Sequence, residues 1–191
     1  MNRYVVLIRG INVGGKNKMS MESLRTYLEE LGFSDVSTYI ASGNIIFSSD
    51  KSPAVIKEIV EKMMPEKFKL DSALIKALVL SHEQLKSVVD NKPKGFGDEP
   101  DTYHSDAIFL IDIDIDSAMT VFAPREGVDK VWPGNGVIYS QRVSAERTKS
   151  RLNKIIATPL YQSMTIRSWN TTTKLLNLLN IQAKGLGSTR G

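Results

Sequence analysis

Near its N-terminus the chain reads Tyr4-Val5-Val6-Leu7-Ile8-Arg9-Gly10-Ile11-Asn12-Val13-Gly14-Gly15-Lys16-Asn17-Lys18-Met19. The apolar run at its start predicts a buried strand. The glycine-rich segment predicts a loop of special shape, because glycine adopts positive φ without a steric penalty. Ser20 is then a candidate N-cap, and apolar residues at helical spacing follow it up to Gly32. The stretch therefore predicts a strand, a loop and a helix in this order.

The remainder of the first half continues the pattern. Further strands are expected at residues 36–40, 45–47 and 73–80, and a second helix is expected at residues 53–65. Pro53 is expected to open that helix and Pro65 to help end it. The resulting order is βαββαβ, which is typical of a ferredoxin-like half. With the first and third strands parallel in such a half, Arg9 and Asn44 would lie at opposite ends of the sheet, and Ser42-Gly43-Asn44 would serve as a hairpin turn.

The same order is predicted for the second half. Strands are expected at 107–111, 128–132, 137–140 and 164–167, and helices at 117–122, 145–157 and 171–179. The chain is therefore predicted to be α+β, with two packed ferredoxin-like (βαββαβ) halves, mainly antiparallel sheets and an extra C-terminal helix. The expected parts are an N-terminal subdomain with a trailing helix (1–90), a Gly/Pro-rich linker loop (91–104), a C-terminal subdomain with the final helix (105–182) and a flexible tail (183–191).

Composition excludes several classes of site. The 191 residues include no cysteine, so disulfides, thiolate nucleophiles and Cys-ligated zinc are excluded. His82 and His104 have neither a metal-ligand nor a triad spacing. Asp112, Asp114 and Asp116 alternate at strand period, but they would stand too far apart for one ion, and Asp116 suits a helix cap better. We therefore predict no metal and no cofactor, and leave open whether the protein is an enzyme.

The sequence also carries no membrane or export signal. It contains no run of about 18 apolar residues, so no membrane span is expected. The N-terminus enters a strand at once and lacks the hydrophobic region of a signal peptide. A cytoplasmic location with no membrane partner is the expectation, and the oligomeric state is left open.

The glycine-rich loop nearly fits the phosphate-binding pattern G-x-x-x-x-G-K-[ST], with Gly10, Gly15 and Lys16 in place. Asn17 stands where the pattern has the hydroxyl that holds magnesium. The expected helix cap at Ser20 also comes several residues late, and a βαββαβ half lacks the parallel sheet of P-loop proteins. These departures argue against a true P-loop.

A less specific anion site at this loop remains open. A glycine-rich turn that leads into a helix can hold a phosphate or carboxylate without a metal. We therefore hypothesise a site for a phosphorylated small molecule or nucleotide. Its candidate residues are Arg9, Asn12, Gly14, Gly15, Lys16, Asn17 and Lys18. The alternative is structural: the glycines and asparagines serve positive-φ turns, and the basic side chains lie in water.

The net charge is +4, and the whole excess lies in residues 105–191, because residues 1–104 hold 14 Lys/Arg and 14 Asp/Glu. Basic residues crowd between positions 142 and 154, where a helix would carry a basic face. The alternative function is nucleic-acid binding through this basic 142–154 helix. Its candidate residues are Arg147, Lys149, Arg151, Arg167 and Trp169. The plainer interpretation is a solvated helix face with Trp169 buried. A small enzyme of unknown reaction is the third possibility.

Two segments carry a resemblance to a known family. One runs from Leu7-Ile8-Arg9-Gly10-Ile11-Asn12 through Gly14-Gly15-Lys16-Asn17 to Ser42-Gly43-Asn44-Ile45-Ile46-Phe47, and the other is Thr165-Ile166-Arg167-Ser168-Trp169-Asn170-Thr171. With these residues the chain resembles the bacterial family catalogued as domain of unknown function 1697. Ser168 takes a position where that family usually has asparagine. The resemblance implies a two-part α+β fold and supplies no activity.

Overall fold

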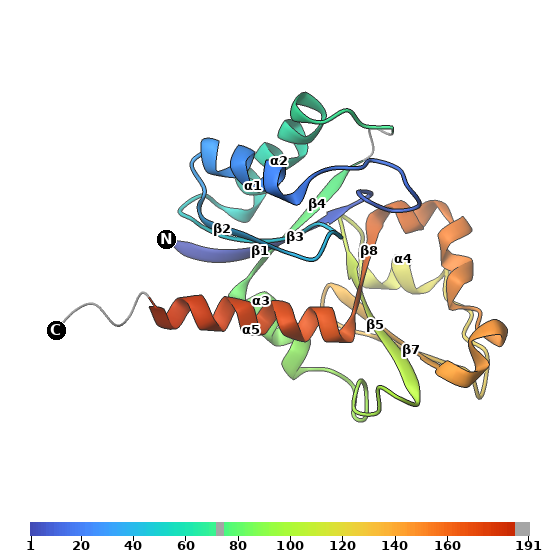
Figure 1. Ribbon diagram of the computed structural model, residues 1–191. Coiled ribbons are helices and arrows are strands. Elements are labelled where there is room, and N and C mark those ends of the chain that lie inside the picture. The colour runs from blue at the N-terminus through green and yellow to red at the C-terminus, as the bar shows by residue number, and fades with distance from the viewer. Residues whose placement is uncertain (72–74, 186–191) are drawn as a thin grey trace. The chain divides into compact units, whose positions relative to one another are not determined.

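The computed structural model describes residues 1–71 and 75–185. It is an α+β structure with two four-stranded antiparallel sheets and a C-terminal helix (Figure 1). The chain divides into two compact units, the first made of Met1–Lys86 with Leu175–Gly191 and the second of Ser87–Lys174. Each unit contains one sheet. Within the described ranges, no helix combines the length and the apolar character that crossing a membrane requires.

The first unit is built on a sheet with the strand order β2-β3-β1-β4. Its elements are β1 (Asn2–Arg9), α1 (Met21–Glu30), β2 (Ser34–Tyr39), β3 (Asn44–Ser49), α2 (Pro53–Lys67), β4 (Lys76–Ser81) and the start of α3 (His82–Asp90). Helices α1 and α2 cover one face of the sheet (Figure 1). Alternate β1 residues, among them Val6 and Ile8, pack there against Leu24 and Leu28 of α1 and Val60 of α2, as a half-buried strand requires.

Local signals set the ends of these helices. The Ser20 hydroxyl accepts the amide of Ser23 at 3.2 Å and caps α1, and Gly32 follows that helix with φ +84°. These features confirm the prediction for α1. Pro53 opens α2 as predicted, but Pro65 lies inside the helix, which continues to Lys67. Pro65 is exposed and close to the end of the helix, so the amide that it lacks interrupts the helix only in its last turn.

The predicted direction of the third strand is wrong. Strands β1 and β3 are antiparallel, with Leu7 opposite Asn44, because the connection through α1 keeps β2 parallel to β1 and the β2–β3 hairpin then reverses the chain. Arg9 and Asn44 therefore lie at the same end of the sheet. The turn itself is present as expected: the Asn44 side chain donates to the carbonyl of Tyr39 at 3.0 Å and to the hydroxyl of Ser42 at 2.9 Å.

The second unit has the sheet order β6-β7-β5-β8. Its elements are β5 (Tyr103–Leu110), α4 (Ile115–Met119), β6 (Asp129–Pro133), β7 (Val137–Val143), three 3-10 segments (Ser144–Lys149, Leu152–Ala157 and Pro159–Ser163), β8 (Met164–Ser168) and the start of α5 (Trp169–Gly185). One sheet face packs Ile108, Leu110 and Ile138 against Ala118 of α4 and Ile155 of the second 3-10 segment. This cluster is the core on that face.

Two predicted elements of the second half are wrong. The basic segment is not an α-helix. Arg142 still belongs to strand β7, Glu146 has non-helical φ/ψ and Ser150 has an extended backbone. The segment therefore consists of short 3-10 turns that follow one another. The buried apolar residues of the second turn, Leu152 and Ile155, are three apart, which is the 3-10 spacing. The predicted start of the helix after β5 is wrong too, because α4 begins at Ile115 and not at Ser117. Asp114, and not Asp116, caps α4 by accepting the amide of Ser117 at 2.8 Å.

Two further expectations fall partly outside the described residues. The fourth strand was predicted from residue 73, but residues 72–74 are not described, and β4 runs from Lys76 to Ser81. Of the predicted tail 183–191, residues 183–185 belong to α5, and 186–191 lie outside the described part of the chain.

Candidate functional site

The glycine-rich loop folds into a tight turn that is closed on itself. The Lys16 amide donates to the carbonyl of Val13 at 3.0 Å. Gly14 and Gly15 between them have φ of +59° and +78°, as a type I′ turn demands. The predicted positive-φ role of the glycines is thus confirmed. The side chains of this tip are exposed.

The two asparagines of the loop brace it from within. Asn12 donates to the carbonyls of Met19 at 3.2 Å and Ala41 at 2.8 Å and accepts the Met19 amide at 2.9 Å. Asn17 donates to the carbonyl of Gly10 at 2.7 Å and accepts the amide of Asp71 at 2.8 Å. Both side chains thus make the bonds that hold the loop in shape.

The loop already holds one carboxylate. The Asn17 amide donates to Oδ2 of Asp71 at 2.7 Å, so a side chain of the same unit accepts a backbone donor of the loop. Lys16 and Lys18 are exposed, and Arg9, half-buried, lies opposite Lys76 in the β1–β4 ladder. The predicted anion-binding residues therefore form two groups. Asn12 and Asn17 make hydrogen bonds inside the loop, whereas Gly14, Gly15, Lys16 and Lys18 are exposed.

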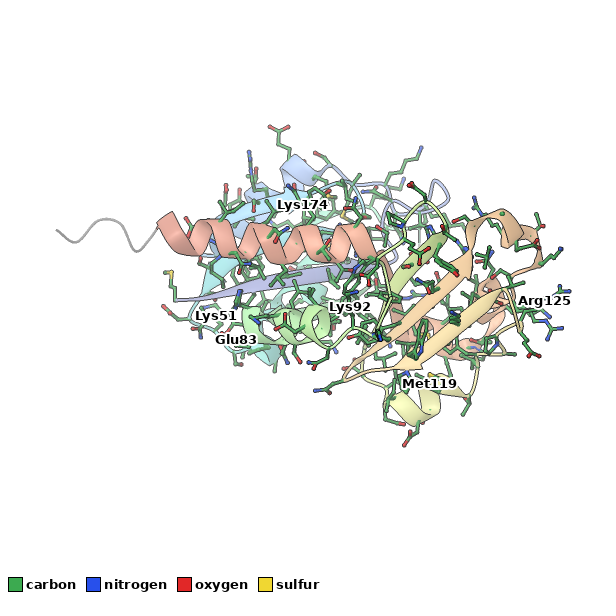
Figure 2. All side chains as sticks on the ribbon, turned by 90° about the horizontal axis from the view of Figure 1, so that it is seen from below. Lys51, Glu83, Lys92, Met119, Arg125 and Lys174 are labelled. Carbon is green, nitrogen blue, oxygen red and sulfur yellow. The ribbon has the colours of Figure 1, made fainter. Side chains whose placement is uncertain are left out.

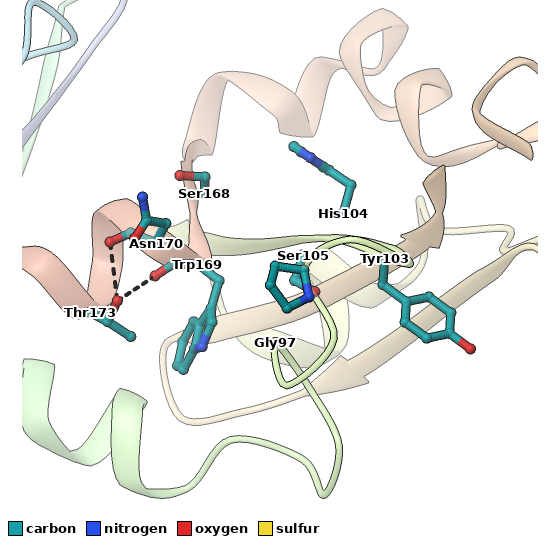
Figure 3. Close-up of a pocket in the computed structure, with 9 residues that line it drawn as sticks. Gly97, Tyr103, His104, Ser105, Ser168, Trp169, Asn170 and Thr173 are labelled. Carbon is teal, nitrogen blue, oxygen red and sulfur yellow. Dashed lines mark hydrogen bonds between the residues drawn. The ribbon is translucent and has the colours of Figure 1, made fainter. Parts of the chain in front are cut away.

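A concave site lies in the second unit (Figure 3). It is a pocket of about 380 Å³, within the range of small-molecule sites. It is lined by Gly97, Pro100, Tyr103, His104, Ser105, Ser168, Trp169, Asn170 and Thr173. The lining comes from the loop before β5, the first residues of β5 and the junction of β8 with α5.

The pocket exists because β5 is longer than its neighbour. The β5–β8 ladder ends at the pair Asp106–Ser168, so within the described chain no β8 residue pairs with 103–105. The Leu110 amide bonds toward β7, to the carbonyl of Gly136 at 3.0 Å. Because these directions alternate along an antiparallel strand, the N–H and C=O of Ser105 face the open side, where the pocket lies.

The other wall is the first turn of α5. The Ser168 hydroxyl accepts the Thr171 amide at 3.2 Å and caps this helix. Thr173 donates its hydroxyl to the carbonyls of Trp169 and Asn170 at 3.2 and 3.1 Å, the dashed lines in Figure 3. Free amides of a first turn attract anions.

Aromatic rings hold Trp169 in place. Trp169, 9% exposed, lies 5.0 Å from the ring of Phe96 and 6.3 Å from that of Tyr139. Tyr139 in turn donates its hydroxyl to the carbonyl of Val88 at 2.7 Å, and burial raises its pKa. The predicted burial of Trp169 is confirmed, and its edge forms a fixed wall of the pocket.

A histidine–aspartate pair stands at the mouth of the pocket. Nε2 of His104 lies 3.1 Å from Oδ2 of Asp106. Burial raises the pKa of the Asp106 carboxyl, although His104 and Arg142 both favour its ionised form. His104 points into the space beside Ser168 in Figure 3. Its imidazole ring can donate a hydrogen bond to a bound anion.

The candidate nucleic-acid residues fall into two environments. Arg147, Lys149 and Arg151 are exposed, and Lys149 pairs with Glu146 at 2.6 Å. Arg167, by contrast, is 7% exposed, and it donates to the hydroxyl of Thr165 at 2.9 Å and to the carbonyl of Ile166 at 2.8 Å. Burial lowers the pKa of Arg167 to about 10, so it stays charged at neutral pH. Arg167 and Trp169 therefore do not share the exposed surface.

A buried carboxylate organises the basic segment. Oδ2 of Asp129 accepts the amides of Arg125 at 3.0 Å and Arg151 at 2.8 Å. Burial opposes ionisation of Asp129, but hydrogen bonds from the Arg151 amide, the Ser150 hydroxyl and the Arg125 amide, with the charge of Arg142, lower its pKa overall. Asp129 thus joins the loop of Arg125 to the loop of Arg151, and both loops carry exposed basic side chains. Figure 2 labels Arg125.

Sequence reasoning missed most of the pocket. His104 was set aside for lack of a partner at catalytic spacing, and Tyr103 and Ser105 were not singled out. The available signal was the motif Ser168-Trp169-Asn170, which supplies the α5 wall. Among the described residues, no group of three or more His, Cys, Asp and Glu side chains is placed to hold a metal ion.

Comparisons with known proteins relate the chain to a family model and to a solved structure. A family model described as "Protein of unknown function (DUF1697)" matches residues 1–139. The solved structure of the conserved bacterial protein SP0830 from Streptococcus pneumoniae is similar over 93% of this chain and 98% of that chain, with a TM-score of 0.79 and 31% sequence identity. No curated protein matches the chain.

Proposed function

The chain belongs to the protein family of unknown function DUF1697, and we propose that it binds a phosphorylated small molecule or nucleotide in the pocket of its second unit. The observation that carries this proposal is the lining itself. The Ser105 backbone edge, the first turn of α5 and the His104 side chain meet at one cavity of about 380 Å³. Backbone donors at a helix start and a nearby cation are the groups that bind phosphate in proteins.

We also propose that both units are ferredoxin-like. The observation in support is that the strand orders β2-β3-β1-β4 and β6-β7-β5-β8 are equivalent. In the second unit, 3-10 turns occupy the place of the second helix.

The glycine-rich loop is the alternative location for the anion. It is supported by the Asn17 amide, which donates a hydrogen bond to the carboxylate of Asp71. It is weakened by the internal bonds of Asn12 and Asn17. At the exposed tip only Gly14, Gly15, Lys16 and Lys18 would be available to an external ligand.

Thermal shift and calorimetric titration against a panel of phosphometabolites and nucleotides test the proposal and its location. We expect stabilisation beyond that given by sulfate. The double variant His104→Gln with Asn170→Ala is expected to weaken binding about tenfold or more, because it removes a charge-assisted hydrogen bond of roughly 1.5–3 kcal/mol. Lys16→Ala with Lys18→Ala is the matched control in the loop. Loss of binding in the control alone would move the site to the loop, and no response to any anion beyond sulfate would refute the function.

Nucleic-acid binding is the second candidate function. The observation that favours it is that the amides of Arg125 and Arg151 both donate to Asp129. The two loops are thereby held together, and their exposed basic side chains lie near one another.

Salt-dependent binding to random-sequence single-stranded oligonucleotides tests this candidate. Replacing Arg147, Lys149 and Arg151 with alanine removes three cations and is expected to reduce the log–log salt slope by about 2, at roughly 0.7 per phosphate contact. Replacing the exposed Lys51, Lys62 and Lys69 of the first unit is the control with the same number of charges. Equal slopes in both triple variants would exclude this surface.

A further inference from the structure

A second cavity lies beside the pocket, and Tyr103 lines both. The second cavity has about 290 Å³ and is lined by Tyr103, Gly127, Val128, Asp129, Lys130, Gln141 and Val143. In Figure 3 the ring of Tyr103 extends to the side away from α5. Tyr103 is therefore the residue that the cavity beside α5 shares with the cavity beside β6.

The two cavities share a continuous floor. Ser105 in the first cavity and Gln141 in the second are opposite each other in the β5–β7 ladder, so their side chains lie on the same sheet face. The Gln141 amide donates to the Ser105 hydroxyl at 3.1 Å. On the far side Gln141 is opposite Lys130 of β6. The floor thus crosses three strands without interruption.

The chemistry of this groove changes along its length. At one end is the first turn of α5, whose backbone amides suit an anion. In the middle is the half-buried ring of Tyr103, with Nζ of Lys130 5.8 Å from the ring centroid. A π face next to a cation is the combination that holds a nucleobase by stacking. A phosphorylated sugar has no π face to stack on this ring, so it would gain less from it than a nucleobase would.

We propose that the ligand of this groove is a nucleotide, with its phosphate at the α5 end and its base stacked on Tyr103. This inference rests on the proposed function and makes it more specific: it selects nucleotides among phosphorylated small molecules and assigns the choice to Tyr103. The cavity next to Lys130 accommodates the outer edge of the base.

The test compares three probes by calorimetry: adenosine 5′-monophosphate, ribose 5-phosphate and inorganic phosphate. The wild-type protein is expected to bind the nucleotide at least fivefold more tightly than ribose 5-phosphate. Tyr103→Leu is expected to weaken nucleotide binding by about 5- to 150-fold, the range for loss of one base–aromatic stack. It should weaken ribose 5-phosphate binding much less, because the sugar has no base to stack on the ring. Tyr103→Phe, which keeps the ring, is the matched control and should retain the preference.

The outcomes separate the inference from the function on which it rests. Equal affinity for the nucleotide and for ribose 5-phosphate, unaffected by Tyr103→Leu, overturns the inference and leaves phosphate binding in the pocket intact. No binding of any of the three probes overturns both. The Tyr103→Leu variant, shown by circular dichroism to be folded, can also keep the preference for the nucleotide. In that case Tyr103 does not stack on the base, and the inference is again overturned.

Discussion

Gly97→Ala is expected to lower the free energy of unfolding by about 2–5 kcal/mol, the sum of overpacking and left-handed backbone strain. Gly97 has φ +74°, and a Cβ there would lie 2.2 Å from Cδ1 and 2.5 Å from Nε1 of Trp169. The indole is held by Phe96 and Tyr139, so it has little room to move away. Because Gly97 and Trp169 both line the pocket, ligand binding should weaken as well.

Gly95→Ala is the control for this experiment. Gly95 lies in the same loop with φ +80°, and a Cβ there would meet nothing within 4 Å. Only the backbone strain of about 1–2 kcal/mol is then expected. Urea unfolding followed by circular dichroism and tryptophan fluorescence measures both variants. Equal losses in the two would show that the Trp169 contact does not restrict position 97.

Asp129→Ala is expected to cost about 2–4 kcal/mol of stability. The variant leaves the Arg125 and Arg151 amides without their acceptor, and each unsatisfied donor costs roughly 1–3 kcal/mol, less where water can reach it. Urea unfolding measures the loss. Asp114→Ala is the comparison, because Asp114 also accepts a backbone amide but is exposed. Its loss should be clearly smaller, because water can replace an exposed N-cap.

The pH dependence of Asp129→Asn gives a second readout. The folded-state pKa of Asp129 is lowered, so its ionisation stabilises the fold at pH values above the unfolded pKa, about 3.9. That contribution is lost as the pH falls through the folded pKa. The stability difference between wild type and Asp129→Asn should therefore be largest near neutral pH and shrink below about pH 4. A difference that does not vary between pH 7 and pH 3 would contradict the assignment.

Local signals in the sequence predicted most elements correctly, because each signal acts within a few residues. Ser20 and Gly32 mark the ends of α1, and Pro53 marks the start of α2. Strand direction, in contrast, depends on how the α1 connection and the following hairpin combine, and the prediction of parallel β1 and β3 failed there. The basic segment failed for a related reason: its shape depends on a bond from the Arg151 amide to Asp129, 22 positions away.

The pocket could be predicted only in part. Its α5 wall comes from a recognisable motif at Ser168-Trp169-Asn170. Its other wall comes from Tyr103, His104 and Ser105, about 65 positions earlier in the sequence, and only the pairing of β5 with β8 brings the two together. The end of that ladder at Asp106–Ser168 is a property of register, which short sequence patterns do not report. For the same reason the shared role of Tyr103 in two cavities has no signature in the sequence.

Helix α5 contributes to both units, since its residues up to Lys174 belong to the second and those from Leu175 to the first. The first unit is therefore assembled from two parts of the chain that are synthesised far apart in time. In the C-terminal part of the first unit, Oδ1 of Asn180 lies 2.6 Å from Nε2 of His82. Leu175 and Leu179 of the same part are buried. The first unit is therefore complete only when the end of α5 has been made, although the second unit lies between its two parts in the sequence.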